Sequence, residues 1–211
     1  MKRVLFLVCI LMGMVGSAQV NDKLPAANVF KIGNYTVTMK NSFEFYSVDK
    51  QSNDTLLIEI CSNNMFAPFG VFKDTNAIKQ SQLKNYRMRN RIGTGEDAHL
   101  VQTTLTSDTN NLEYYFFSNA ETAAHSYIIR GNIFDPKLKI FNTIQLGVDK
   151  KTFYDTFFIS YPQALESNFN YVILQTCVFG IQHIYRFEKN KLYSVRFRCP
   201  NCVGVKRIDK Y

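Results

Sequence analysis

The sequence lacks the motifs by which many enzymes and metal proteins are recognised. It has only three histidines, His99, His125 and His183, and none stands in an H-E-x-x-H or similar metal-ligand spacing. It has no Gly-x-Ser-x-Gly nucleophile elbow, and "RIGTGEDAH" (residues 91–99) lacks the Gly-Lys-Ser/Thr ending of a phosphate-binding loop. We therefore expect the histidines in the core or at strand edges, and we predict no catalytic residue, no metal site and no cofactor.

Long apolar runs are also scarce, and the one that exists stands at the start of the chain. Lys2 and Arg3 precede an apolar run from Val4 to Val15, and the small residues 16–18 follow it. This order predicts a signal peptide over residues 1–18, cleaved before Gln19. The run is too short to span a bilayer, and no later segment is apolar enough to do so. The mature chain is therefore expected in the periplasm, at the cell surface or outside the cell.

Acidic residues are fewer than basic ones. The formal net charge is +8, and it falls to +6 when Lys2 and Arg3 leave with the signal peptide. This modest excess favours attraction to anionic glycans, lipid head groups or acidic proteins. Nucleic acid is not expected as a partner, because no recognition motif is present and an exported protein rarely meets it.

Most of the remaining chain has the alternation and the aromatic content of β-strands. Two helices are expected. The first is capped by Asp74 and ends near Tyr86, and the second is capped by Asp149 with an apolar stripe of Phe153, Phe157 and Phe158. The sequence thus predicts an α+β fold, mostly antiparallel sheet with two short helices, whose strands cover residues 31–39, 42–48, 55–61, 99–107, 112–118, 126–134, 171–179, 181–188 and 192–199.

The chain repeats one plan. Gly70-Val71 and Gly147-Val148 lie 77 residues apart, and each pair precedes an Asp-capped helix followed by three expected strands. This predicts a tandem duplication, with helix-sheet repeats at 63–135 and 136–211 and additional N-terminal strands at 19–62 packed on them. The alternative is a chance recurrence of a common α+β pattern.

The second repeat resembles a known fold. "IQLGVDKKTFYDTF" followed by the hairpin "YRFEKNKLYSVRF" is similar to the helix-then-sheet unit of the β-lactamase inhibitory protein-like fold, over residues 144–197. Residues 69–134 form a fainter copy. The resemblance implies two helix-plus-sheet repeats that form one curved sheet, whose concave face binds a partner protein. It implies no catalytic residues.

Cysteines are few, and four remain after the signal peptide: Cys61, Cys177, Cys199 and Cys202. The last two form a C-x-x-C around Pro200-Asn201, which is good turn chemistry. A structural Cys199–Cys202 disulfide is the preferred interpretation, because an exported chain with an even number of cysteines meets oxidising conditions. A redox couple and a zinc site that includes His183 are the alternatives. Cys61 and Cys177 form a second bridge or stay as buried thiols.

The register of the last hairpin determines which side chains share a face. A three-residue loop, Lys189 to Lys191, separates apolar from polar residues best: it pairs Phe187 with Tyr193 and His183 with Phe197 and directs Cys199 toward the core. The polar face then carries the predicted binding residues Arg186, Arg196 and Arg198, with Tyr171 and Gln182 nearby. The alternative is a solvated face with Glu188 as partial counter-charge.

A second basic cluster, Lys84, Arg87, Arg89 and Arg91, is expected to close the first helix and enter a loop, where cations oppose the negative end of the helix dipole. The sequence as a whole predicts a non-enzymatic exported domain that presents a curved antiparallel sheet to a protein or an anionic surface glycan. A thiol-active or zinc-binding protein that uses Cys199 and Cys202 is the alternative.

Overall fold

The structure is a computed structural model that describes residues 28–61, 66–94, 100–117, 126–141, 144–177 and 180–201. The predicted signal peptide, His99, His125 and Cys202 lie outside these residues. Within them the fold is mostly β-sheet with a few short helices, as the sequence predicts.

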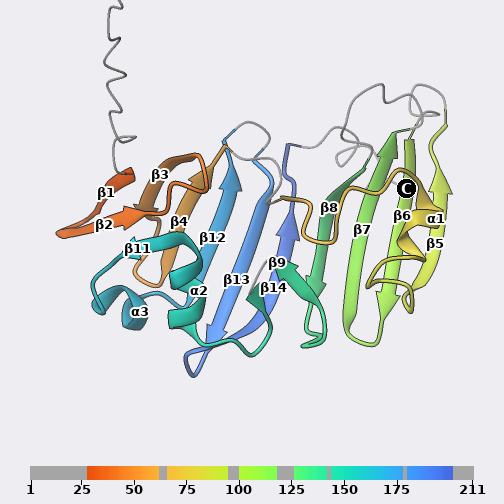
Figure 1. Cartoon of the computed structure of the whole chain (residues 1–211). Coiled ribbons are helices and arrows are strands. Elements are labelled where there is room, and N and C mark those ends of the chain that lie inside the picture. Colours follow the sequence, from red (N-terminus) through yellow and green to blue (C-terminus); the bar gives the residue numbers. More distant parts are fainter. Residues whose placement is uncertain are drawn as a thin grey trace, which may run out of the picture.

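One nine-stranded sheet dominates the molecule (Figure 1). Neighbouring strands are antiparallel except for β4 and β12, which run parallel. In spatial order the strands are β3 (Phe45–Lys50), β4 (Thr55–Ile60), β12 (Tyr171–Thr176), β13 (Gln182–Glu188), β14 (Lys191–Arg198), β8 (Ser126–Ile133), β7 (Asn110–Phe117), β6 (Leu100–Ser107) and β5 (Arg87–Ile92).

The remaining elements are short. A three-stranded sheet contains β1 (Asn28–Ile32), β2 (Tyr35–Met39) and β11 (Phe158–Ser160), and a two-stranded one contains β9 (Lys139–Phe141) and β10 (Ile144–Gln145). The helices are α1 (Thr75–Ile78), α2 (Lys150–Phe157) and α3 (Ala164–Asn168). In Figure 1 these helices lie in front of the large sheet, α2 and α3 toward β12 and α1 toward β5.

The core lies between the helices and this covered face of the large sheet. Phe153 of α2 is fully buried, and its ring centroid lies 4.8 Å from that of Tyr185 and 5.1 Å from that of Phe187. Toward the other end of the sheet, Phe72 packs edge-on against Tyr114 at 5.6 Å. Burying one large apolar side chain contributes about 1.5–3 kcal/mol to the free energy of unfolding, so this aromatic layer is a major source of stability.

The first helix is shorter than predicted. Asp74 caps it as expected, with its Oδ1 accepting hydrogen bonds from the backbone N–H groups of Asn76 and Ala77, but it ends at Ile78 rather than near Tyr86. The hydroxyl of Ser81 donates to the carbonyl of Ile78 and accepts from the N–H of Leu83. A serine that satisfies backbone groups in this way offers the chain an alternative to helix, which explains the early end.

The second helix begins where the sequence predicts. Oδ1 of Asp149 accepts a 2.7 Å hydrogen bond from the N–H of Thr152, and this bond lowers the pKa of the Asp149 carboxyl. The helix ends at Phe157, so Phe158, expected in its apolar stripe, is instead the first residue of β11, although it is buried.

The last hairpin combines two registers. Next to the turn, Phe187 pairs with Leu192, so the loop is the two-residue Lys189-Asn190 and not the predicted three-residue loop. Both loop residues have positive φ, 48° and 62°, as a type I′ turn requires. A bulge at Tyr193 then shifts the register, and His183 pairs with Phe197 as predicted. Tyr193, expected in the core, is 47% exposed because it occupies the bulge.

Two of the four described N-terminal strands, β3 and β4, join the main sheet. β3 and β4 extend it through the parallel pairing of β4 with β12, over six aligned residue pairs from Thr55–Tyr171 to Ile60–Thr176. The sequence predicts three strands directly after each helix, and the structure differs from this prediction. In the structure α1 is followed by an additional strand, β5, and α2 by β11 and α3 before β12 begins.

Candidate functional site

The second face of the large sheet carries the arginines. We call it the open face, because among the described residues no helix packs on it. Strand alternation assigns the side chains: Phe197 is 1% exposed on the covered face, so its neighbours Arg196 and Arg198 lie on the open one. Following the paired residues across the strands places every described arginine on the same side. We call this set the arginine face: Arg87, Arg89, Arg91, Arg130, Arg186, Arg196 and Arg198.

Lysines are distributed differently. In the described part of the chain they lie on helices, turns, the small sheets and the ends of strands. The difference matters chemically, because a guanidinium is planar and binds carboxylate, sulfate or phosphate through two parallel hydrogen bonds, whereas an ammonium is a point charge. The open face is therefore suited to planar recognition of anionic groups.

A continuous row of polar side chains crosses the open face from one edge of the sheet to the other. Register pairs connect each member to the next. The row contains Ser47, Glu59, Gln175, Gln182, Arg198, Arg130, Glu113, Thr104 and Arg89.

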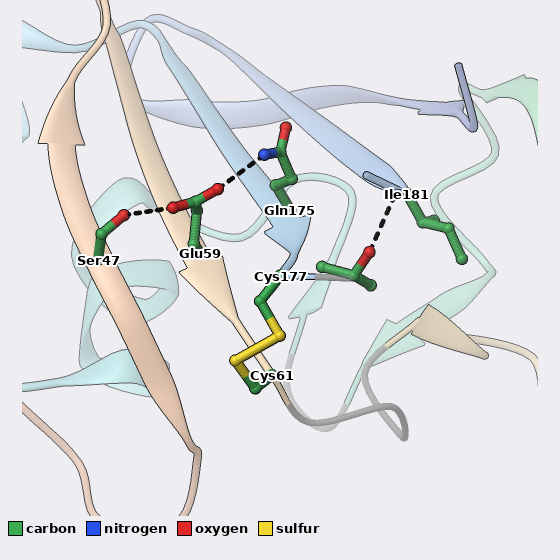
Figure 2. Close-up of a disulfide and its surroundings, with 7 residues drawn as sticks. Ser47, Glu59, Cys61, Gln175, Cys177 and Ile181 are labelled. Atoms are coloured by element: carbon green, nitrogen blue, oxygen red, sulfur yellow. Dashed lines mark hydrogen bonds between the residues drawn. A yellow bond between two sulfur atoms is a disulfide. The ribbon is translucent and has the colours of Figure 1, made fainter. Parts of the chain in front are cut away.

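One half of this row is linked by hydrogen bonds. Glu59 accepts from the hydroxyl of Ser47 at 2.7 Å and from the amide of Gln175 at 2.8 Å, as Figure 2 shows. Gln175 in turn accepts from the amide of Gln182 at 2.7 Å. These four side chains therefore satisfy one another's hydrogen bonds within this half of the row.

The other half surrounds a hollow of about 520 Å³ over β7, β8 and β14. Glu113 is 7% exposed and forms an ion pair with Arg130. Arg196 and Arg198 line the same hollow, and in the described part of the chain neither forms an ion pair with a carboxylate. Among the described residues the hollow therefore holds one arginine neutralised by Glu113 and two arginines without an ion-pair partner. Its other polar lining residues are Thr104, Thr106, Asn111 and Asn132.

The residues predicted for binding all lie on the open face, but their roles differ. Arg196 and Arg198 line the hollow. Gln182 is engaged with Gln175, and Arg186 forms a 2.5 Å ion pair with Glu188 and lies 5.3 Å from the ring centroid of Tyr193. Tyr171 pairs with Arg186, away from the hollow.

Sequence reasoning missed part of the arginine face. Arg130 was not predicted as part of any site, and Arg87, Arg89 and Arg91 were assigned to a helix end and a loop. That assignment is wrong: residues 87–92 form strand β5, and these three arginines face Thr106, Thr104 and Gln102 of β6. The alternation of arginine with other residues in "RMRNRI" has the period of a strand, and it was the signal that could have identified β5.

The cysteines divide between the two faces. Cys61 and Cys177 form a disulfide with their Cα atoms 5.1 Å apart, immediately beyond the last aligned residues of β4 and β12 (Figure 2). This pairing was one of those left open by the sequence. Cys199 is 2% exposed on the covered face, as predicted, and it is disulfide-bonded; its partner lies outside the described residues, so the pairing with Cys202 stays a prediction.

His183 is a core residue. It is 1% exposed, and its ring lies 4.8 Å from that of Phe197 and 5.0 Å from that of Phe66. Desolvation lowers its pKa to about 3, so the imidazole is neutral at physiological pH. Within the described residues, no group of three or more His, Cys, Asp or Glu side chains is placed to hold a metal ion.

Comparison with known proteins found no match: no family model, no curated protein and no solved structure matches this chain. Among the described residues no helix is long and apolar enough to cross a membrane.

Proposed function

We propose that the protein is a non-enzymatic exported binding protein that presents the arginine face to an anionic partner, an acidic protein or a surface glycan. One observation carries the proposal: every described arginine lies on the open face of one sheet, and two of them, Arg196 and Arg198, line a hollow and have no carboxylate partner among the described residues. Charges held on a rigid sheet and left unneutralised favour binding of an opposite charge.

Export is part of the proposal. It is supported by the signal-peptide pattern of residues 1–18 and by the Cys61–Cys177 disulfide, because disulfides persist mainly in oxidising compartments.

We also propose that the sheet arose by duplication. We further propose that the protein has a β-lactamase inhibitory protein-like fold and, as that resemblance implies, binds a partner through a face of its sheet. The strand order supports the duplication: β6-β7-β8 and β12-β13-β14 meet at the antiparallel pair β8–β14 and run outward from it in opposite directions. Gly70 and Gly147, which precede the two helices, have similar positive φ values, 95° and 90°.

The proposal is tested by comparing two double variants that lose the same charge. Arg196→Gln with Arg198→Gln removes two arginines that line the hollow, whereas Lys137→Gln with Lys139→Gln removes two exposed lysines near β9. Retention on an immobilised heparin column is measured as the salt concentration that elutes each protein. We expect the arginine variant to elute at clearly lower salt than the lysine variant. Equal elution would show that net charge alone, and not the arginine face, determines binding.

A further inference from the structure

In the described part of the chain, the large sheet ends in a strand, β5, whose outer edge has no partner strand. β5 pairs with β6 in an uninterrupted register from Arg87–Thr106 to Ile92–Val101, and among the described residues no backbone hydrogen bond reaches its other side. Ile92, at its end, is 68% exposed. A regular strand of six residues without a bulge is a template for a further strand.

The register shows which backbone groups point outward. The N–H of Gly93 donates to the carbonyl of Leu100 at 3.0 Å, and this pair continues the β5–β6 register. Hydrogen-bonded pairs alternate in an antiparallel ladder, so Arg87, Arg89 and Arg91 are bonded to β6. The N–H and C=O groups of the intervening residues, Met88, Asn90 and Ile92, therefore point away from the sheet.

This alternation brings the side chains of Arg87, Arg89 and Arg91 close to the side chains of any strand added to this edge. Residues opposite Arg87, Arg89 and Arg91 on an antiparallel partner would form non-hydrogen-bonded pairs, the positions at which cross-strand side chains come closest. On the β6 side the arginines face only the neutral Thr106, Thr104 and Gln102. Among the described residues no carboxylate pairs with these three arginines, and opposite charges directly across a ladder stabilise it.

We propose that the outer edge of β5 is a strand-addition site for an extended acidic segment of a partner protein, with Asp or Glu at every second position. This inference rests on the proposed function and narrows its partner to a polypeptide, since a glycan cannot complete the backbone ladder. A second copy of the chain is disfavoured, because in-phase pairing of two β5 edges places arginine opposite arginine. The same charges that repel basic strands select an acidic one.

The test uses fluorescence anisotropy with a short labelled peptide that alternates glutamate with valine. Ile92→Pro removes an outward N–H without removing a bond to β6, a position at which an edge strand tolerates proline. Ile92→Ala, its matched control, loses the side chain but keeps the N–H. We expect Ile92→Pro to bind the peptide about tenfold more weakly than Ile92→Ala, in line with the loss of one backbone hydrogen bond. Thermal unfolding of both variants checks that the sheet is intact.

Arg89→Glu provides a second variant that leaves the backbone unchanged, and we expect it to weaken peptide binding by tenfold or more. Equal affinities of Ile92→Pro, Ile92→Ala and the wild type would overturn strand addition, and the proposed function would stand if the heparin test succeeds. Binding of a heparin oligosaccharide without binding of the peptide would also overturn it and favour a glycan. Binding of neither probe would overturn both proposals.

Discussion

At the scale of single residues, His183 shows how burial determines the state of a side chain. Its ring is enclosed by aromatic rings, and its Nε2 has no hydrogen-bond partner among the described residues. The neutral form fits this apolar site, whereas an imidazolium would lose its hydration. His183 thus contributes to packing, and its burial makes the free energy of unfolding smaller at acidic pH.

This arrangement predicts a pH dependence. The pKa of His183 is about 3 in the folded state and about 6.5 in the unfolded state. Between these values the unfolded chain binds more protons, so the free energy of unfolding falls as the pH is lowered. From pH 7 to pH 5 the wild type should lose about 2 kcal/mol more than His183→Phe, measured by urea denaturation at both pH values. Parallel losses in the two proteins would show that the imidazole is not buried as a neutral group.

Gly131 has a steric role that no other residue type can fill without a clash. It lies on β8 beside the hollow, where a Cβ atom would come 2.4 Å from the carbonyl oxygen of Asn111 and 2.9 Å from Cα of Leu112. Gly131→Ala should therefore push β7 and β8 apart and lower the free energy of unfolding by about 1–3 kcal/mol, measured by chemical denaturation. An alanine variant as stable as the wild type would contradict the close approach of these strands.

At the scale of elements, the Cys61–Cys177 disulfide joins the ends of the one parallel strand pair in the large sheet as described. The two cysteines are 116 residues apart in sequence. In the chain-entropy account a bridge over so long a loop stabilises the fold by about 4–5 kcal/mol. Replacing both cysteines with serine should lower the free energy of unfolding by an amount of this order, measured by urea denaturation. A loss well below 1 kcal/mol would indicate that the bridge does not constrain the unfolded chain.

The sequence predicted which helices and strands form better than it predicted where each of them ends. Caps at Asp74 and Asp149 and the alternation of most strands were readable, because these signals lie within a few neighbouring residues. The end of α1 depended on hydrogen bonds of Ser81, and the hairpin register depended on a bulge at Tyr193 that compensates for a shorter loop. Neither has a distinct pattern in the sequence. β5 was missed because its arginines were interpreted as helix-end cations.

At the scale of the whole molecule, the sheet has one covered face and one open face, and the two differ in chemistry. Aromatic residues fill the covered face, and arginines with neutral polar residues occupy much of the open one. The polar face around Arg196 was predictable from the alternation of β13 and β14. Its continuation across β8 and β5 was not, because it depends on the pairing of β14 with β8 and of β5 with β6, which brings distant segments together.

The most direct test of the central claim is an NMR titration of isotope-labelled arginine side chains with a soluble anionic probe, a heparin oligosaccharide. The guanidinium signals of Arg196 and Arg198 should shift first and furthest, and those of Arg186, which is paired with Glu188, should shift less. Unchanged guanidinium signals of Arg196 and Arg198 on addition of the probe would contradict the account.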